Sequence, residues 1–343
     1  MGEIAPVSVS RRGVTMADVA REAGVSRQLV SLVIRDVGYV APEKRSLVLA
    51  AAERLGYRRN TLAASLAGRR TFSVGLAVLD IHNQVYAEFA DGVADVLEPA
   101  GYQLLLAAGV HLGDGGLASL GALVGLRVDG ILIATHFTDD VRLEQLLAGT
   151  PTVTLGEASG VPVIDAVQGD DALGTRLATE HLLAQGHRDI AYVGGPDTQQ
   201  NAARRSGYRE AMTAASLPTR EVDADATETG GAHALLTLLR GPGPRPSAVV
   251  CYNDASAIGV LACAQRERLL VPEHLAVVGY DNTRAAGYPG VDLTSVDQHA
   301  RDIGARAAGL LLERIADPDR DAVTDILTPR LVVRGSSSHY LTH

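Results

Sequence analysis

The sequence predicts an all-α helix-turn-helix head followed by an α/β domain of two lobes. Residues 15–35 have the pattern of two short helices with a glycine between them, and from Phe72 onward apolar strands alternate with helices. Charge divides the chain in the same way. Residues 11–70 carry twelve Lys and Arg against five Asp and Glu, a net +7, whereas the whole chain carries −9 and the remainder therefore −16. A basic head on an acidic body is typical of a DNA-binding module joined to a second domain.

The start of the basic head has the local signals of two helices and a tight turn. Thr15 is followed three residues later by Asp18, a spacing at which the two residues cap the start of a helix reciprocally. Gly24 supplies the positive φ that the turn needs, and Ser26 is placed to cap the second helix. A third helix over about 42–55 begins with Pro and has one apolar face, so it closes a small three-helix core.

In a helix-turn-helix, the first residues of the second helix reach base edges in the major groove. Here these residues are Arg27 and Gln28, whose side chains suit guanine and adenine respectively. Arg35 and Arg58 are interpreted as phosphate contacts, which position a protein without reading sequence. On an isolated helix Arg27 and Gln28 would be ordinary surface residues, so the interpretation depends on the motif. The expected DNA-contacting set also includes Thr15, Ser26, Ser31 and Asn60.

Residues 60–70 predict a hinge helix that is stable only when it packs against something else. Asn60 can cap it and Gly68 can end it, which leaves about two turns. Leu66 would be an exposed leucine on this linker. In a DNA-bound dimer it could act as a wedge in the minor groove, and the alternative is that it packs on the following domain.

After Arg70 the chain has the pattern of a doubly wound α/β fold, long enough for two lobes rather than one sheet. The strands are continuous apolar runs, as expected where helices cover both faces of a sheet. Strand candidates are 72–79, 102–107, 130–134, 152–155, 189–194, 248–252 and 275–279, with helices such as 172–185, 201–215 and 255–268 between them.

Ligands of open α/β sheets bind beyond the carboxyl ends of the strands, so polar residues at strand ends are the candidate site. Asp80 and His82 follow the first strand, Asn253 and Asp254 follow a later one, and Asp281 follows the last. A carboxylate with amide and guanidinium donors opposite it suits the hydroxyls of a polyol or sugar. Asp254 is interpreted as a helix cap, while Asp80 and His82 are left open between ligand contact and structural role.

Several motifs together resemble the lactose/galactose repressor (LacI/GalR) family. They are VTMADVAREAGVS, LAAAERLGYRRN, LAASLAGRRT, VGLAVLDIHN, GHRDIAYVGGP, ARRSGYREAM, CYNDASAIG and VVGYDNT. The resemblance covers about residues 14–335. It implies a helix-turn-helix and hinge helix joined to a regulatory domain shaped like a periplasmic sugar-binding protein, with a chain that passes between the lobes three times.

By this resemblance Arg204, Asn253, Asp281 and Gln298 match effector-contacting positions of the family. Arg204 would also accept an anionic ligand. Asp80 and Tyr86 are expected to complete the effector site.

The chain departs from the family pattern in both candidate sites. In the recognition helix the family often has Thr-Val-Ser-Arg where this chain has Leu-Val-Ser-Leu, so Leu32 stands in place of an Arg that commonly reaches DNA. Arg35 replaces a common Asn. In the first effector-side loop the family often has Asn-Pro-Phe-Phe, and this chain has Asn-Gln-Val-Tyr over 83–86, which alters the pocket wall.

The expected domains are a helix-turn-helix head over 14–59, a hinge helix and linker over 60–70, an effector-binding and dimerisation domain over 71–335, and a tail over 336–343. Within the third, lobe one is expected over 72–164 and 297–326, and lobe two over 165–296 and 327–335. The resemblance implies a homodimer on a near-palindromic double-stranded DNA operator, with affinity set by a small polar effector. Repression rather than activation is an expectation of the family.

Other function classes have less support. A periplasmic binding module is opposed by the basic head and by the missing export signal in 1–12. An enzyme is opposed by the lack of a nucleophile elbow, a phosphate loop or a metal cluster, so no cofactor and no metal are expected. No apolar run approaches the ~20 residues of a membrane span, and a cytoplasmic location is expected. Cys251 and Cys263 are expected to be buried free thiols. Because there is no Trp, a sugar stays one option beside a nucleoside or another small polar ligand.

Overall fold

The computed structural model describes residues 14–35, 38–57, 70–109, 114–134 and 140–338. The chain forms two compact units, residues 1–71 and residues 72–343. The first unit is a helical head, and the second is a body with two sheets.

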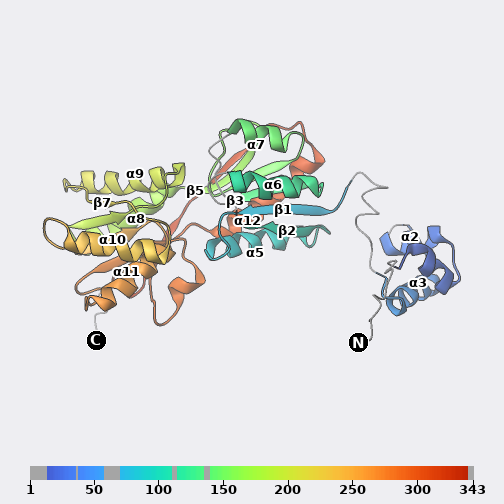
Figure 1. Cartoon of the computed structure of the whole chain (residues 1–343), viewed down its shortest axis with the longest axis horizontal. Helices are drawn as coiled ribbons and strands as arrows, with labels where there is room; N and C mark the ends of the chain where they lie inside the picture. The colour runs from blue at the N-terminus through green and yellow to red at the C-terminus, as the bar shows by residue number, and fades with distance from the viewer. Residues whose placement is uncertain (1–13, 36–37, 58–69, 110–113, 135–139, 339–343) are drawn as a thin grey trace, which may run out of the picture. The chain divides into compact units, whose positions relative to one another are not determined.

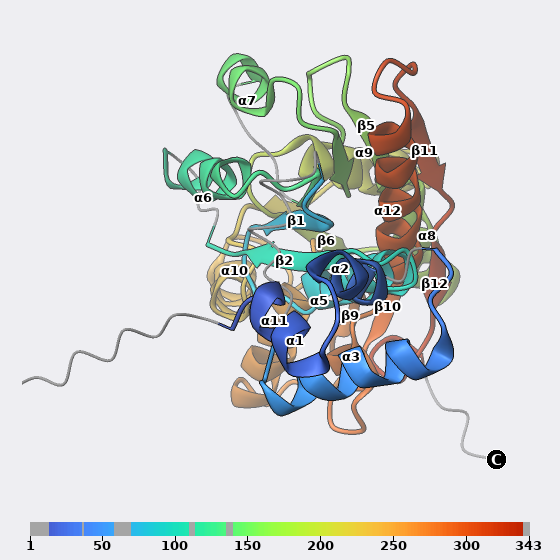
Figure 2. The same cartoon turned by 90° about the vertical axis from the view of Figure 1, so that its right-hand side faces the viewer.

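The described residues of the head form three short helices (Figure 2): α1 (Met16–Ala23), α2 (Arg27–Arg35) and α3 (Pro42–Arg54). The Oγ1 of Thr15 accepts a hydrogen bond from the backbone N–H of Asp18 at 3.3 Å, and Asp18 Oδ2 accepts one from the N–H of Thr15 at 3.0 Å. Gly24 has a φ of 62°, and Ser26 Oγ accepts a hydrogen bond from the N–H of Leu29 at 3.2 Å. The predicted capping box, the glycine turn and the second cap are therefore confirmed.

Each head helix buries small or branched apolar side chains in one core. Val19 of α1, Val30 of α2, and Val48 and Ala51 of α3 are fully buried. Leu32 is partly buried and packs against this core. The residue that replaces the family's common Arg thus takes part in packing the head.

Each lobe of the body is built on one sheet. Sheet A contains β1 (Ser73–Val78), β2 (Gln103–Ala107), β3 (Gly130–Ala134), β4 (Thr152–Leu155), β5 (Asp165–Gly169) and β11 (Thr324–Leu327). Sheet B contains β6 (Ile190–Val193), β7 (Glu221–Val222), β8 (Ala248–Cys251), β9 (Ala276–Tyr280), β10 (Thr294–Asp297) and β12 (Arg330–Val332). The strand orders are β11-β5-β4-β3-β1-β2 and β12-β10-β9-β8-β6-β7, with parallel pairing except that β12 runs antiparallel to β10.

Helices cover both faces of each sheet (Figure 1). Sheet A packs α5 (Val85–Leu97) and α12 (Ala300–Ala316) on one face, and α6 (Asp114–Gly125) and α7 (Asp140–Leu147) on the other. Sheet B packs α8 (Asp171–Ala184) and α9 (Gln199–Ala214) on one face, and α10 (Glu228–Arg240) and α11 (Asp254–Arg266) on the other. A short 3-10 helix, η1 (Arg284–Gly287), follows β9. The doubly wound α/β prediction is confirmed, and Cys251 and Cys263 are buried free thiols.

Two glycines bring α5 and α12 into direct backbone contact. A Cβ on Gly92 would lie 1.9 Å from the carbonyl oxygen of Arg301, and one on Gly304 would lie 2.2 Å from that of Phe89. Since neither backbone can give way easily, larger residues at these positions would push the helices apart. This close packing fixes α5, whose first turn forms part of the cavity wall described below.

The chain passes between the two sheets three times, after β5, after β10 and after β11. The expected first boundary at 164 is too early, because β5 pairs with β4 and with β11 and so belongs to lobe one through Gly169. The strand is short and polar at both ends, which hid it in the sequence. The expected tail also begins too early. Ser336 and Ser337 are buried, and Ser336 Oγ donates to the carbonyl oxygen of Val277, so lobe two extends to these serines.

Among the described residues, no helix is both long and apolar enough to cross a membrane.

Candidate functional site

The candidate DNA-contacting surface of the head is the first turn of α2. Arg27 and Gln28 are exposed there, and the Ser26 cap fixes the start of the helix that presents them. Ser31 lies one turn further along and is partly buried. Thr15 and Ser26 are exposed, and their hydroxyl groups serve as helix caps.

For the remaining predicted DNA-contacting residues, the side chain or the whole residue lies outside the described part of the chain. Arg35 ends α2, but its side chain is outside the described part of the chain. Arg58, Asn60 and Leu66 lie outside the described residues altogether, as do all residues of the predicted hinge up to 69.

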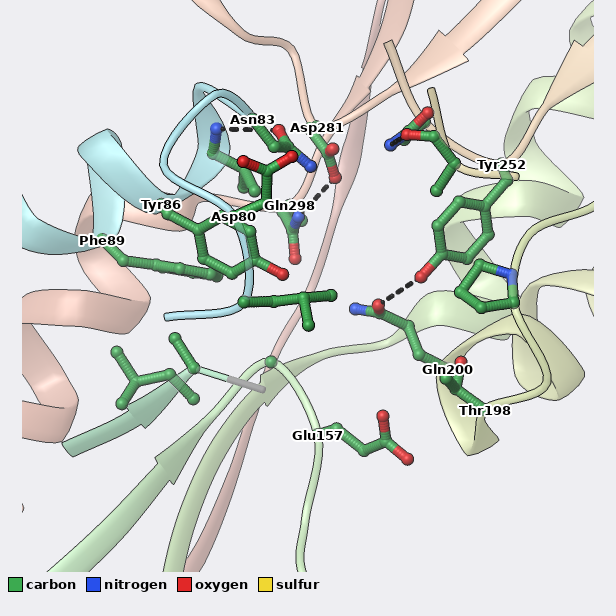
Figure 3. A pocket seen from close by; sticks show the side chains of 18 of the residues that line it. Asp80, Asn83, Tyr86, Phe89, Glu157, Thr198, Gln200, Tyr252, Asp281 and Gln298 are labelled. Atoms are coloured by element: carbon green, nitrogen blue, oxygen red, sulfur yellow. Dashed lines mark hydrogen bonds between the residues drawn. The ribbon is translucent and has the colours of Figure 1, made fainter. Parts of the chain in front are cut away.

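A cavity of about 480 Å³ lies in the body and is lined by side chains from both lobes (Figure 3). It brings together all six residues that the sequence predicts for effector binding: Asp80, Tyr86, Arg204, Asn253, Asp281 and Gln298. His82, the other candidate after β1, is exposed. In Figure 3, Asp80, Asn83, Tyr86 and Phe89 face Tyr252, Gln200 and Thr198 across the space, with Asp281 and Gln298 between them.

Arg204 of α9 is the only cation that lines the described cavity, and it is 1% exposed. Its Nε donates to Asp171 Oδ1 at 2.7 Å, and its Nη1 donates to the carbonyl oxygen of Tyr252 at 2.5 Å. Its Nη2 is 3.7 Å from Asp281 Oδ1, and its guanidinium carbon lies 3.6 Å from the ring centre of Tyr280. The guanidinium is therefore already engaged on several sides, and the expectation that it would accept an anionic ligand is not supported by this geometry.

Two buried carboxylates share this one guanidinium. Burial raises the pKa of both Asp171 and Asp281, against the lowering effect of Arg204. Glu157, from the loop after β4, has its pKa raised by burial, with a further contribution from the charge of Asp171. With Asp80 also on the wall, carboxyl groups outnumber guanidinium groups among the described residues that line the cavity.

Asp281 is oriented by the backbone at the end of β9. Asp281 and Asn282 have φ values of 104° and 50°, in the left-handed region that non-glycine residues rarely adopt. The turn is held by Arg334, whose Nη2 donates to Asn282 Oδ1 at 2.7 Å. Gln298 Nε2 donates to Asp281 Oδ1 at 2.6 Å, so an amide from the crossing segment fixes the carboxylate.

Asn253 has the expected place on the cavity wall and also the helix-cap role that was expected of Asp254. Asn253 lines the cavity, but its Oδ1 caps α11 by accepting a hydrogen bond from the N–H of Ser256 at 2.9 Å. Asp254 is not the cap. Its carboxylate accepts hydrogen bonds from the backbone and hydroxyl of Thr283 and from the hydroxyl of Ser295. The sequence could not separate these adjacent residues, because both side chains are common at helix starts.

Lobe one supplies an aromatic wall. The ring centres of Tyr86 and Phe89 on α5 are 6.2 Å apart, and burial raises the pKa of the Tyr86 hydroxyl. Across the cavity the hydroxyl of Tyr252 donates to Gln200 Oε1 at 2.8 Å. A low overall aromatic content therefore did not prevent aromatic side chains from gathering at this site.

Several lining or supporting residues were not predicted, namely Asp171, Glu157, Gln200 and Tyr252. Asp171 is at the first position of α8, where an acidic residue reads as a helix-start preference. Its pairing with Arg204 spans 33 residues, and no local pattern reveals such a contact. Tyr252 immediately precedes Asn253 and is the last residue of a predicted strand. Its position at a strand end could therefore have indicated that it lines the site.

Within the described residues, no group of three or more His, Cys, Asp or Glu side chains is arranged to hold a metal ion. A helix-turn-helix head joined to a two-lobed body with a polar cavity defines a class of protein, the ligand-responsive DNA-binding regulators.

Comparisons with known proteins agree with this class. Residues 15–60 match the family model of bacterial regulatory proteins of the lacI family, and residues 179–337 match a periplasmic binding protein-like domain. The chain is 34% identical over 330 residues to catabolite control protein A of Priestia megaterium, covering 94% of this chain and 99% of the relative. It is 35% identical over 329 residues to the ribose operon repressor of Escherichia coli strain K12, with the same two coverages of 94% and 99%.

Comparison with solved structures also indicates this class of regulator. The crystal structure of the lac repressor dimer bound to operator and the anti-inducer ONPF matches with a TM-score of 0.83 and 26% identity, over 96% of this chain and 100% of that chain. The chain belongs to the lacI family of bacterial regulatory proteins. It is a ligand-responsive, sequence-specific DNA-binding transcription regulator and not an enzyme.

Proposed function

We propose that this chain is a homodimeric repressor of the cytoplasm that binds a near-palindromic operator. Its affinity for the operator is controlled by a small, uncharged, polyhydroxylated ligand. The ligand binds in the cavity between the lobes. The observation that carries the ligand class is the lining of the cavity, in which carboxyl groups outnumber one guanidinium that already donates hydrogen bonds through Nε and Nη1.

The operator is read by the exposed first turn of α2. Arg27 donates two hydrogen bonds to a guanine edge and Gln28 pairs with an adenine edge, contributions of ~1–3 kcal/mol each. Thr15, Ser26, Ser31, Arg35 and Arg58 contact the phosphate backbone, while Asn60 and Leu66 act in the hinge. Because Leu32 packs on the head core, the base contact that the family commonly makes from that position is not available here.

The ligand is held by polar groups from both lobes. Asp281 and Asp80 accept hydrogen bonds from ligand hydroxyls, Gln298 and Asn253 orient these contacts, and Arg204 donates from behind. Tyr86, Phe89 and Tyr252 provide apolar ring faces for the carbon skeleton of a sugar. A phosphate or carboxylate on the ligand would meet Asp80, Asp281 and Glu157, and among the described lining residues Arg204 is the one cation near them.

The DNA half of the proposal is tested by operator selection with variants. Arg27→Ala and Gln28→Ala should each lower affinity for the selected sequence by about five- to a hundredfold and relax the preference at one base position. Lys44→Ala, an exposed cation on α3, is the control and should affect all sequences alike. Loss of affinity without any change in base preference for either α2 variant would contradict base reading by these residues.

The ligand half is tested by thermal stability in the presence of matched compounds. We expect neutral pentoses and hexoses to include a compound that raises the melting temperature, and the phosphorylated form of the same compound to have no effect. A stabilising sugar phosphate whose effect disappears in Asp281→Asn would contradict the proposed ligand class.

A further inference from the structure

Two helices of lobe two begin at hydrogen-bond acceptors that belong to lobe one. The first N–H groups of a helix have no acceptor inside the helix and need one from elsewhere. At the start of α9, Glu157 Oε1 accepts a hydrogen bond from the N–H of Gln199 at 3.2 Å. In the first turn of η1, the N–H of Ala285 donates to Gln84 Oε1 at 3.1 Å. Side chains of lobe one therefore complete two helix starts of lobe two.

Both contacts join segments that are far apart along the chain. Glu157 and Gln199 are separated by 42 residues, and Gln84 and Ala285 by 201 residues. The two acceptors follow β4 and precede α5 in lobe one, whereas α9 and η1 pack on sheet B. These hydrogen bonds can exist only while the lobes are close together, so each one stabilises the closed arrangement.

The two contacts lie at different edges of the cavity. Glu157 lines the cavity and its partner Gln199 is exposed, so this contact lies at the solvent-facing rim. Gln84 is not part of the cavity wall, but its neighbour Asn83 is. Asn83 and Glu157 lie on opposite sides of the space in Figure 3. The cavity is therefore flanked by two direct contacts between the lobes.

The start of α9 is fixed within lobe two before it meets lobe one. Thr198 Oγ1 accepts a hydrogen bond from the N–H of Asn201 at 3.0 Å and so caps the helix. The hydroxyl of Tyr252 donates to Gln200 Oε1 at 2.8 Å. The first N–H of the helix is thus presented at a defined position, and the contact with lobe one forms without further ordering of the helix.

We propose that Gln84 and Glu157 form a two-point clasp that holds the lobes together in the absence of ligand. Opening of the lobes breaks both hydrogen bonds, and water replaces the lost partners. Because a hydrogen bond that is exchanged with water contributes modestly, removal of one point should raise the open fraction about two- to tenfold. The clasp itself does not depend on the proposed ligand. Under the proposed function, it must open before a ligand enters or leaves the cavity.

Hydrogen–deuterium exchange of the full chain, without sugar or DNA, tests the clasp at the two donor groups themselves. Each N–H is protected while its acceptor is in place, so its exchange rate follows the open fraction. Mass spectrometry with electron-transfer fragmentation resolves the amides of Gln199 and Ala285. The decisive measurement is the exchange at one contact when the acceptor of the other contact has been removed.

The expected result is reciprocal. Gln84→Ala should speed the exchange of the Gln199 amide, and Glu157→Ala should speed that of the Ala285 amide, by about two- to tenfold each. Glu157→Gln keeps an oxygen acceptor at the same place. It should therefore leave the exchange of the Ala285 amide close to the wild-type rate, which separates the hydrogen bond from the charge.

The matched controls are Gln145→Ala and Glu144→Ala, at exposed positions of α7 in lobe one, and they should change neither amide. The amides of β8, in the core of lobe two, should exchange at the wild-type rate in every variant. Acceleration confined to the amide whose own acceptor was removed would overturn the clasp, because the two contacts would then open separately. Equal acceleration in β8 would also overturn it, because the substitution would then loosen lobe two as a whole.

Failure of the clasp is distinguishable from failure of the proposed function. A chain whose melting temperature is raised by a neutral sugar, but whose two contacts open separately, refutes the clasp alone. Reciprocal acceleration in a chain that no neutral sugar stabilises supports the clasp and contradicts the proposed ligand class.

Discussion

Two buried charge clusters, one in each lobe, contain the same kinds of side chain in opposite proportions. In lobe one, Asp165 is fully buried and accepts hydrogen bonds from Arg314 through Nε and Nη2, each at 3.0 Å. Arg320 donates to the same carboxylate at 3.2 Å, and the backbone N–H of Val323 does so at 2.7 Å. In lobe two the proportions are reversed, because Arg204 serves both Asp171 and Asp281.

A structural ion cluster differs from a candidate binding site in whether its charged groups already have partners within the protein. Both cations around Asp165 have further partners, since Arg314 also donates to the carbonyl oxygens of Pro318 and Asp321, and Arg320 Nη2 is 3.4 Å from Glu313 Oε2. The cluster is therefore complete and closed. Arg204 and Asp281 of the second cluster instead line the cavity, where ligand hydroxyls would reach Asp281 under the proposed function.

The largest expected effect is in the complete cluster. Asp165→Asn leaves Arg314 and Arg320 with an uncharged partner, and breaking such a buried group lowers the free energy of unfolding by about 3–5 kcal/mol. Urea denaturation of the full chain near neutral pH measures this. A loss of unfolding free energy below about 1 kcal/mol would contradict the view that the Asp165 cluster is a structural ion cluster on which stability depends.

The same substitution in the second cluster should have the opposite effect on stability. The pKa of Asp281 is raised in the folded chain, so its ionised form costs stability that grows as the pH rises above its ordinary value. Asp281→Asn removes this cost and should stabilise the free protein at pH 8 by on the order of 1 kcal/mol, while it abolishes the response to ligand.

Melting curves of wild type and Asp281→Asn at about pH 5 and pH 8 give the readout for this second prediction. The advantage of the variant should be larger at the higher pH. Asp225→Asn, an exposed acid on the same cavity wall, is the matched control and should change stability little. A variant that is less stable than wild type at both pH values would assign Asp281 a structural role like that of Asp165.

The smallest expected effect on stability comes from an exposed ion pair, which serves as a reference for the two buried clusters. Asp95 and Arg301 join α5 to α12 through an exposed ion pair at 2.7 Å. Because water and salt screen such pairs, Asp95→Asn should change the free energy of unfolding by less than about 1 kcal/mol, measured by the same urea titration. A loss as large as that of Asp165→Asn would mean that burial is not what separates these clusters.

Much of the fold was predictable because its signals are local. The Thr15 and Asp18 capping box, the Gly24 turn and the Ser26 cap each depend on residues within one turn, and the apolar strands depend on short runs. Site residues at strand ends were predictable for a related reason, since the topology of a doubly wound sheet collects them at one edge.

What could not be predicted depends on contacts between distant residues. Asp171 became part of the site only through Arg204. Asp254 does not cap α11 because its carboxylate accepts hydrogen bonds from Thr283 and Ser295, and Asn253 is the cap instead. The first lobe boundary was misplaced because β5 is recognisable mainly by its partners β4 and β11. Leu32 was recognised as a departure in sequence, but its packing role required the head core.

Reading of a specific DNA sequence by the head is best measured by selecting bound fragments from random DNA with the whole chain at near-physiological salt. We expect recovery of a near-palindromic sequence whose half-sites lose one base preference in Arg27→Ala and another in Gln28→Ala. Recovery of sequence-independent fragments alone, in the presence as well as the absence of a stabilising sugar, would contradict it.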